Sequence, residues 1–246
     1  MESIELIILI IILFFTSILA YKSSFLQHRK IGYISLLQIL YLVLLPGLAY
    51  TIIFSYILSL LQRPLNNYVL LKDSLLVNMF LISSLYTYGG IAIHSVCKTM
   101  SSFYRPKQQS SLVCQVNKYF HLDFSHNLVF AGLLVSLVSF AILEINHLPS
   151  YQDSLGSLML IVIGIVSGLA AAGCLTFLYQ KKSWLELKFF FIIFWLATIV
   201  LIIASRPYLK NIYFFPITLI TLTAFAILGS LNIFLIIRGL KNKLSC

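Results

Sequence analysis

Long apolar stretches separated by short polar segments dominate the chain. There are seven of these stretches, and the length of each is close to or above the ~20 residues that a helix needs to cross a ~30 Å hydrocarbon core. They cover residues 3–21, 33–62, 74–98, 127–145, 154–179, 185–205 and 212–237. The pattern predicts an all-α fold, a polytopic transmembrane bundle of about seven helices. Because the connections are short, we expect residues 1–246 to form a single integral membrane domain.

Two of these stretches contain residues that alter a plain helix. Pro46 and Gly47 lie in the middle of 33–62 and predict a kink or a tilt there. Gly164 and Gly168 lie four residues apart in the fifth stretch, and small residues with this spacing let two helix backbones approach closely. We interpret them as a packing face.

The first stretch raises the question of a cleaved signal peptide. No Lys or Arg precedes it, and the apolar run from Ile4 to Ala20 is longer than the 7–15 residues of a signal-peptide core. We therefore predict a helix that is retained.

The segment 99–126 is the one long connection. Apolar residues at 112, 113, 116, 119 and 120 follow helical spacing along one face, and Ser110 or Ser111 can cap the start. The pattern predicts a short interfacial amphipathic helix near 110–120 with its apolar face in the lipid. A turn at Asp123–His126 would then lead into the next helix.

Composition supports lipid as the main solvent of this chain. Hydrophobic residues make up 60% and charged residues 10%, with a mean hydropathy of +0.99, whereas soluble domains carry about 25% charged residues. The net charge of +10 is dispersed over short connections, which excludes a nucleic-acid-binding stripe. The expected partners are the lipid bilayer and other membrane proteins, and the expected location is the cell (plasma) membrane.

The basic residues also predict an orientation. The segments that follow the first, third, fifth and seventh stretches, counted with the adjoining helix ends, contain 13 of the 17 Lys and Arg residues. The N-terminus and the segments that follow the second, fourth and sixth stretches contain the other four. Since Lys and Arg are enriched in cytoplasmic loops, we predict the N-terminus outside and the C-terminus in the cytoplasm. The four cysteines (Cys97, Cys114, Cys174 and Cys246) then lie on the cytoplasmic side, where thiols stay reduced, and no disulfide is expected.

Histidines define the candidate site. His94 lies one turn before the end of the third helix and His126 in the first turn of the fourth, so the two lie at similar depth in antiparallel helices. His121 precedes that point, and Asp123 is three residues from His126. These four residues could ligate Zn or Fe, or two opposed imidazoles could hold a haem. The spacing matches no standard ligand motif such as H-E-x-x-H.

A second interpretation of the same residues stays open. A histidine suits a membrane interface because its ring has an apolar body and a polar tip. Asp123 or Ser125 can act as the N-cap of the fourth helix. Elsewhere, Lys72 and Asp73 can neutralise each other at the outer start of the third helix.

In helix number and predicted orientation the chain resembles the alkaline ceramidase and adiponectin receptor superfamily. Those proteins hold zinc with three histidines, two of them on the seventh helix. The seventh stretch here, from Tyr213 to Arg238, contains no histidine. The resemblance is therefore architectural, and it implies no site residues.

Three classes of function remain. The first is a membrane protein without an evident catalytic motif: a subunit, a scaffold or a small-molecule permease. The second is a membrane-embedded metal or haem protein with lipid or quinone chemistry, whose site lies at the cytoplasmic ends of the third and fourth helices. The third is a signalling receptor that acts through a partner, since no soluble output domain is evident. No charged residue lies near the middle of a stretch, which disfavours an ion-coupled transporter.

Overall fold

The computed structural model describes residues 22–103, 111–149, 157–179 and 184–244, together with residues 5, 8, 9, 12, 13, 16, 19 and 20. The predicted first helix at 3–21 therefore lies largely outside the described residues. Among the described residues, Cys97 and Cys114 are free thiols. The predictions for Cys174 and Cys246 concern side chains outside the described part.

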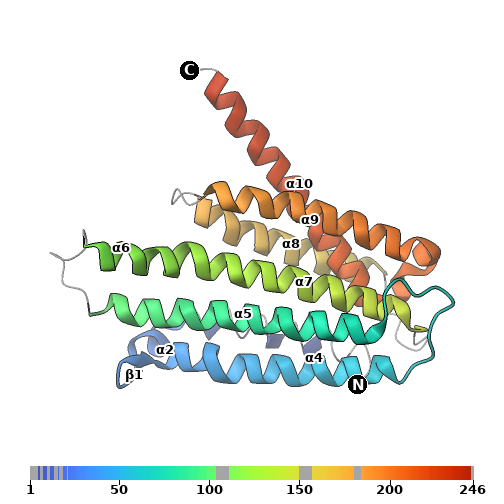
Figure 1. The fold of residues 1–246 in the computed structure, drawn as a ribbon, viewed down its shortest axis with the longest axis horizontal. Helices are drawn as coiled ribbons and strands as arrows, with labels where there is room; N and C mark the ends of the chain where they lie inside the picture. The colour runs from blue at the N-terminus through green and yellow to red at the C-terminus, as the bar shows by residue number, and fades with distance from the viewer. Residues whose placement is uncertain are drawn as a thin grey trace. The chain divides into compact units, whose positions relative to one another are not determined.

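The described chain is almost entirely helical (Figure 1). It divides into two compact units. The first unit comprises Met1–Gln62 and Leu81–Val135, and the second comprises Arg63–Phe80 and Ser136–Cys246. Helices α5 and α7 pass from one unit into the other. The elements are α2 (Ser24–His28), β1 (Lys30–Ile31), β2 (Ile34–Ser35), α3 (Leu36–Ile39), the π-helical turn η1 (Leu40–Leu44), α4 (Leu45–Leu61), α5 (Asp73–Ser101), α6 (Leu112–Tyr119), the π-helical turn η3 (Phe120–Phe124), α7 (Ser125–Asn146), α8 (Ser157–Tyr179), α9 (Trp184–Ser205), the 3₁₀ segment η4 (Arg206–Phe214) and α10 (Pro216–Leu244).

The all-α prediction is confirmed apart from one small hairpin. Strands β1 and β2 pair antiparallel, Lys30 with Ser35 and Ile31 with Ile34. Gly32 supplies the positive φ of 62° that this tight turn needs, a conformation that costs a glycine little.

Four helical segments of the described chain are long and apolar enough to cross a membrane. They are Leu36–Leu61, Asp73–Ser101, Leu112–Asn146 and Ile193–Phe214. Two shorter apolar helices, Leu158–Ala172 and Pro216–Leu231, fall in the predicted fifth and seventh stretches. These features are those of a membrane protein, while the full set of seven spans and their orientation stay predictions.

The irregularity expected in the second stretch is a widened helical turn. The π-helical turn η1 directly precedes α4, and Pro46 occupies the first turn of α4. Proline lacks a backbone N–H, and its ring clashes with the carbonyl four residues earlier in a regular helix. A turn with wider hydrogen bonding relieves that clash without ending the helix, so α3, η1 and α4 run on as one segment.

The connection into α7 differs from the sequence prediction. A short helix with exposed apolar residues does lie at Leu112–Tyr119, and Ser111 caps it by accepting a hydrogen bond from Cys114 N. No turn follows, because η3 joins α6 directly to α7. The interpretation of Asp123 or Ser125 as an N-cap is therefore wrong: Asp123 lies inside the π-helical turn, and the Ser125 hydroxyl donates to the carbonyl of His121.

The spacing of contacts explains why this turn is widened. On α5 the contact points Cys97, Gly90 and Ser83 are seven residues apart. They face Asn117, Ser125 and Gly132 in that order. Seven residues make about two helical turns, but Asn117 and Ser125 are eight apart, which would rotate Ser125 by ~100° away from α5. The widened turn η3 accommodates the extra residue, so that Asn117, Ser125 and Gly132 all face α5.

In the second unit, α8 packs against α10 through the two predicted glycines. A Cβ at Gly164 would lie 2.6 Å from Thr223 Cβ, and one at Gly168 would lie 2.7 Å from the carbonyl oxygen of Ala224. Real Cβ atoms do not approach other atoms so closely, so the helices can pack at this distance only without side chains there. The predicted packing face is confirmed.

A polar cluster joins the segment before α5 to the end of α7. Asn66 donates from Nδ2 to the carbonyls of Ile145 and His147, at 2.6 and 2.9 Å. Asp73 lies 2.8 Å from Asn146 Nδ2 and 3.1 Å from His147 Nε2. Asp73 therefore pairs with residues at the end of α7, and the expected neutralisation by Lys72 is not the pairing that the structure has.

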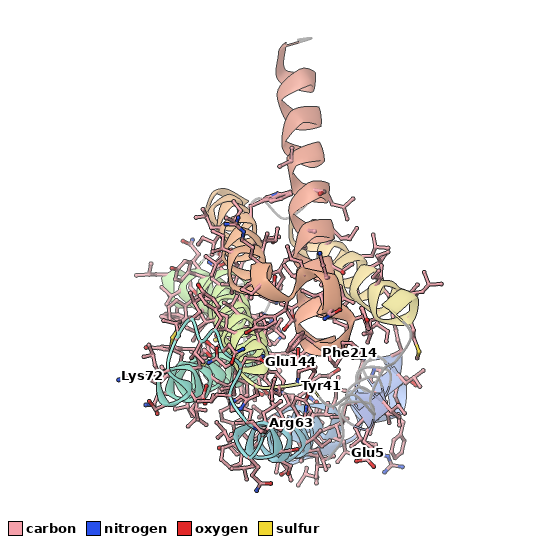
Figure 2. All side chains as sticks on the ribbon, turned by 90° about the vertical axis from the view of Figure 1, so that its right-hand side faces the viewer. Glu5, Tyr41, Arg63, Lys72, Glu144 and Phe214 are labelled. Atoms are coloured by element: carbon pink, nitrogen blue, oxygen red, sulfur yellow. The ribbon has the colours of Figure 1, made fainter. Side chains whose placement is uncertain are left out.

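One buried carboxylate caps a helix from another helix. Glu144 of α7, labelled in Figure 2, is only 3% exposed. It accepts hydrogen bonds from Ile217 N at 3.2 Å, Thr218 N at 2.8 Å and the Thr218 hydroxyl at 2.9 Å. The first backbone N–H groups of a helix have no partner within the helix, and its N-terminus carries a partial positive charge. Glu144 therefore meets both needs at the start of α10.

Candidate functional site

Three imidazole rings meet in the first unit, as the depth argument predicted for His94 and His126. The His94 ring centroid lies 5.0 Å from that of His126 and 4.3 Å from that of His121. The glycine contacts described above bring this part of α5 against α7, since a Cβ at Gly90 would lie 2.7 Å from the carbonyl oxygen of Ser125. The two helices are thus neighbours where the histidines lie.

Hydrogen bonds fix the orientation of two of these rings. His126 Nδ1 lies 2.6 Å from the carbonyl oxygen of Leu122, and His94 Nδ1 lies 3.2 Å from that of His121. A carbonyl oxygen only accepts, so each Nδ1 carries the hydrogen and donates it. In the neutral form of each ring Nε2 then carries the lone pair, and neither Nε2 has a hydrogen-bond partner among the described residues.

Asp123, the fourth predicted ligand, lies in η3 between His121 and His126. Its Oδ1 is buried and has no hydrogen-bond partner within the described part of the chain. Across the described residues, no group of three or more His, Cys, Asp and Glu side chains has an arrangement that could hold a metal ion. The structure therefore brings the three histidines together, and a metal shell that includes Asp123 stays a prediction.

A cavity of about 270 Å³ lies beside His94 and His126. Apolar side chains of all three contributing segments form part of its wall: Leu37, Ile91 and Val129. Tyr41 of η1 and Lys98 of α5 add a hydroxyl and an ammonium group. The cavity therefore combines apolar walls with polar atoms, which is the usual character of a small-molecule site.

Sequence reasoning missed the contribution of the second stretch to this cavity. Gln38, which also lines it, accepts from Ser35 N and Oγ and donates to Ser95 O, Ser95 Oγ and Thr99 Oγ1. These bonds hold α3 against α5. Two signals were present: Ser35 and Gln38 have the spacing of a capping box, which the structure contains, and Gln38 is a polar residue inside an apolar stretch.

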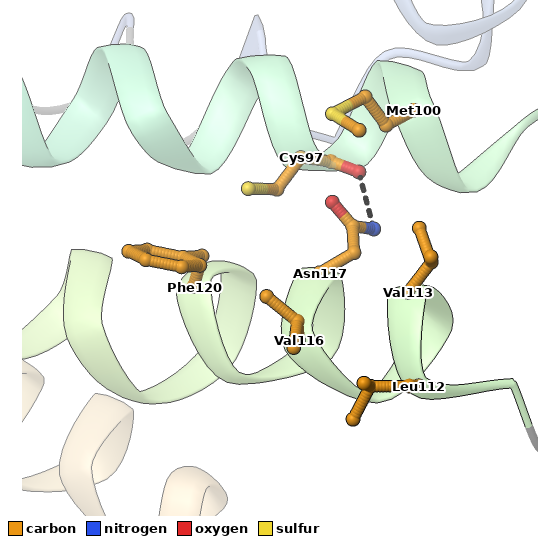
Figure 3. Close-up of a pocket in the computed structure, with 7 residues that line it drawn as sticks. All are labelled: Cys97, Met100, Leu112, Val113, Val116, Asn117 and Phe120. Atoms are coloured by element: carbon orange, nitrogen blue, oxygen red, sulfur yellow. Dashed lines mark hydrogen bonds between the residues drawn. The ribbon is translucent and has the colours of Figure 1, made fainter.

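A second cavity, of about 300 Å³, lies between α5 and α6 (Figure 3). Asn117 points from α6 toward α5 and donates to Cys97 O and Ser101 Oγ, each at 3.1 Å. The other lining side chains are a thiol and apolar groups: Cys97, Met100, Leu112, Val113, Val116 and Phe120. This cavity offers almost no polar group to a ligand, and its contacts serve helix packing.

Taken together, the first unit places two imidazole acceptors, one phenol and one ammonium group around a partly apolar cavity. Such groups can bind and orient a ligand. Comparisons with known protein families, with curated proteins and with solved structures find no match for this chain.

Proposed function

We propose that this chain is a multi-pass integral membrane protein without catalysis of its own: a membrane subunit, a scaffold or a small-molecule permease. In this proposal about seven helices cross the cell membrane, with the N-terminus outside and the C-terminus in the cytoplasm. Its surroundings are the bilayer and other membrane proteins.

Exposed apolar surface on the long helices carries this proposal. Leu85 of α5 is 70% exposed, Leu158 of α8 is 74% exposed and Leu196 of α9 is 55% exposed. Soluble monomers rarely expose apolar residues as continuous surface, whereas lipid solvates such side chains. A half-buried polar group of the described helices, that of Gln38, binds a neighbouring helix, which is a structural use.

Orientation provides the first test. A fusion of a reporter that folds or fluoresces only in the cytoplasm should be active at the C-terminus and inactive at the N-terminus, because the basic residues favour that arrangement. A matched pair of fusions with a reporter active only outside should give the opposite result. An active outside reporter at the C-terminus would contradict the proposed topology.

A second function is favoured by one observation, the imidazole cluster. Metal-binding histidines commonly donate their other ring N–H to a backbone carbonyl, as His94 and His126 do. His94, His121 and His126, with or without Asp123, would then hold Zn, Fe or haem, and the protein would act on lipids or quinones.

Metal and absorbance analysis of the purified protein separates the two functions. For the proposed subunit or permease we expect no stoichiometric metal and no Soret band, in wild type or in the His94→Ala/His126→Ala double variant. For the second function, wild type would hold about one metal ion or haem per chain, and the double variant would lose it. His28→Ala is the matched control, because exposed His28 also bonds the carbonyl four residues earlier, Ser24 O, at 2.7 Å.

A further inference from the structure

We propose that the cavity beside His94 and His126 binds the head group of an anionic amphiphile that carries hydroxyl groups, such as a phosphoglycerol head. This inference rests on the proposed membrane placement. The inference adds a ligand class and a binding site to that membrane placement. Charge, hydrogen-bonding capacity, size and backbone geometry support both.

Charge selects an anion. Lys98 is the one Lys or Arg among the described lining residues, and none of those residues is acidic. Lys98 is exposed and has no ion-pair partner among the described residues. It lies in the last turn of α5, where a membrane-spanning helix reaches the depth of the lipid head groups. An anionic oxygen of a ligand would supply the partner that this ammonium group lacks.

Hydrogen bonding selects hydroxyl groups in addition to the anion. With Nδ1 of His94 and His126 donating to backbone carbonyls, each ring in its neutral form offers Nε2 as an acceptor. A phosphate diester or carboxylate has no donor for these two nitrogens. Hydroxyl groups beside the charged oxygen do, so a head group such as phosphoglycerol can bond Lys98 and both rings together.

The amides and hydroxyls of the remaining lining residues are already engaged. Gln38 bonds Ser95 and Thr99, and Ser125 donates to His121 O at 2.7 Å. These groups shape the cavity and hold its walls, and they leave Lys98 and the two imidazoles to meet a ligand.

Size and lining argue for an amphiphile of which only one end enters. A cavity of about 270 Å³ is smaller than the ~300–1,000 Å³ pockets that enclose whole drug-sized ligands. It has room for a head group and the first methylene groups, and Leu37, Ile91 and Val129 offer apolar contact to the latter. The rest of an acyl chain would lie in the surrounding lipid.

Backbone geometry provides an independent indication. Two π-helical turns among the described residues of the first unit adjoin lining residues of this cavity: η1 contributes Tyr41, and η3 ends directly before Ser125 and His126. Widened turns are rare in helices and occur frequently at functional sites. Here η3 restores the face of α7 that meets α5, and it thereby sets His126 beside His94.

The test is equilibrium binding to the full chain in a neutral detergent. The probes are dihexanoyl phosphatidylglycerol, dihexanoyl phosphatidylcholine and glycerol 3-phosphate. We expect saturable binding of the phosphatidylglycerol with a stoichiometry near one, and weaker binding of the zwitterionic phosphatidylcholine. Lys98→Gln should weaken phosphatidylglycerol binding about tenfold, which is the scale of one charge-assisted hydrogen bond. Lys98→Arg should restore most of it.

Lys118→Gln is the matched control, since Lys118 is an exposed lysine of α6 that does not line the cavity. It should change the affinity less than twofold. Equal loss in Lys98→Gln and Lys118→Gln, or equal binding of the two phospholipids, would overturn the proposal by showing unspecific charge attraction or detergent-like partitioning. Binding of glycerol 3-phosphate as tight as that of the phospholipid would overturn the amphiphile and assign the cavity to a soluble phosphate.

His126→Phe provides a variant that keeps the ring and removes the acceptor, and it should weaken phosphatidylglycerol binding by about threefold to tenfold. Circular dichroism of each variant shows that the helices persist. Failure of binding in a chain that stays in membranes after carbonate extraction would reject this inference alone. A chain released by carbonate would reject the proposed membrane function itself.

Discussion

Glu144→Leu is expected to lower the free energy of unfolding by about 3–5 kcal/mol. The substitution keeps a similar volume and removes the acceptor for the backbone N–H groups of Ile217 and Thr218 at the start of α10, while the Thr218 hydroxyl keeps the carbonyl oxygen of Ala141, 3.0 Å away, as its acceptor. Thr218 is fully buried and Ile217 is 6% exposed, so water cannot replace the carboxylate. Each buried donor left without a partner costs about 1–3 kcal/mol. Titration of the protein with SDS in mixed micelles, followed by circular dichroism, measures the change.

Two further variants define what the carboxylate contributes. Glu144→Gln keeps one acceptor oxygen and removes the charge that favours a helix N-terminus, so it should cost about 1–2 kcal/mol. Thr198→Val is the control for loss of a buried polar group, because among the described residues the Thr198 hydroxyl bonds only Phe194 O of its own helix. It should cost well under 1 kcal/mol. A Glu144→Leu protein as stable as Thr198→Val would mean that α10 does not depend on this cap.

The parts of the candidate site that follow from depth along a helix could be predicted from the sequence. The sequence pattern places His94 one turn from the end of its helix and His126 in the first turn of the next. In the structure α5 continues to Ser101, about two turns beyond His94, but antiparallel neighbours still bring the two residues to the same level. The ring centroids 5.0 Å apart agree with that argument. The packing role of Gly164 and Gly168 could also be predicted from the sequence, because a residue without a side chain lets another helix approach closely.

The parts that depend on partners distant in sequence could not be predicted. Asp123 and Ser125 are good N-cap residues in isolation, and only the contacts of Asn117 and Gly132 with α5 show why the helix continues through them. Lys72 is the sequence neighbour of Asp73, yet His147 at the end of α7 lies 3.1 Å from its carboxylate. Glu144 finds its partners 73 and 74 residues later. No local pattern encodes such pairings.

The close approach of α8 and α10 leads to the second large expected effect. Gly164→Ala/Gly168→Ala should lower the free energy of unfolding by about 3–5 kcal/mol, because inserting a methyl group into a tight contact costs about 1–3 kcal/mol per site. The new methyl at 164 would meet Thr223 Cβ at 2.6 Å and Ile220 O at 2.9 Å, and neither a branched Cβ nor a backbone oxygen can rotate away. The helices must therefore separate, and packing is lost along both.

Gly47→Ala is the matched control for this pair, and its expected sign is opposite. A Cβ at Gly47 in α4 meets nothing within 4 Å, so alanine there adds no clash. Alanine is a better helix former than glycine by about 0.8–1 kcal/mol in the reference peptides, and Gly47→Ala should leave the protein as stable or slightly more so. If the double variant also gained stability in the SDS titration, helix propensity would outweigh packing, and α8 and α10 could not lie as close as the structure has them.

If each single variant cost about half of the double, the two contacts would act independently along the α8–α10 interface. A smaller total would mean that the first methyl group already separates the helices and relieves the second.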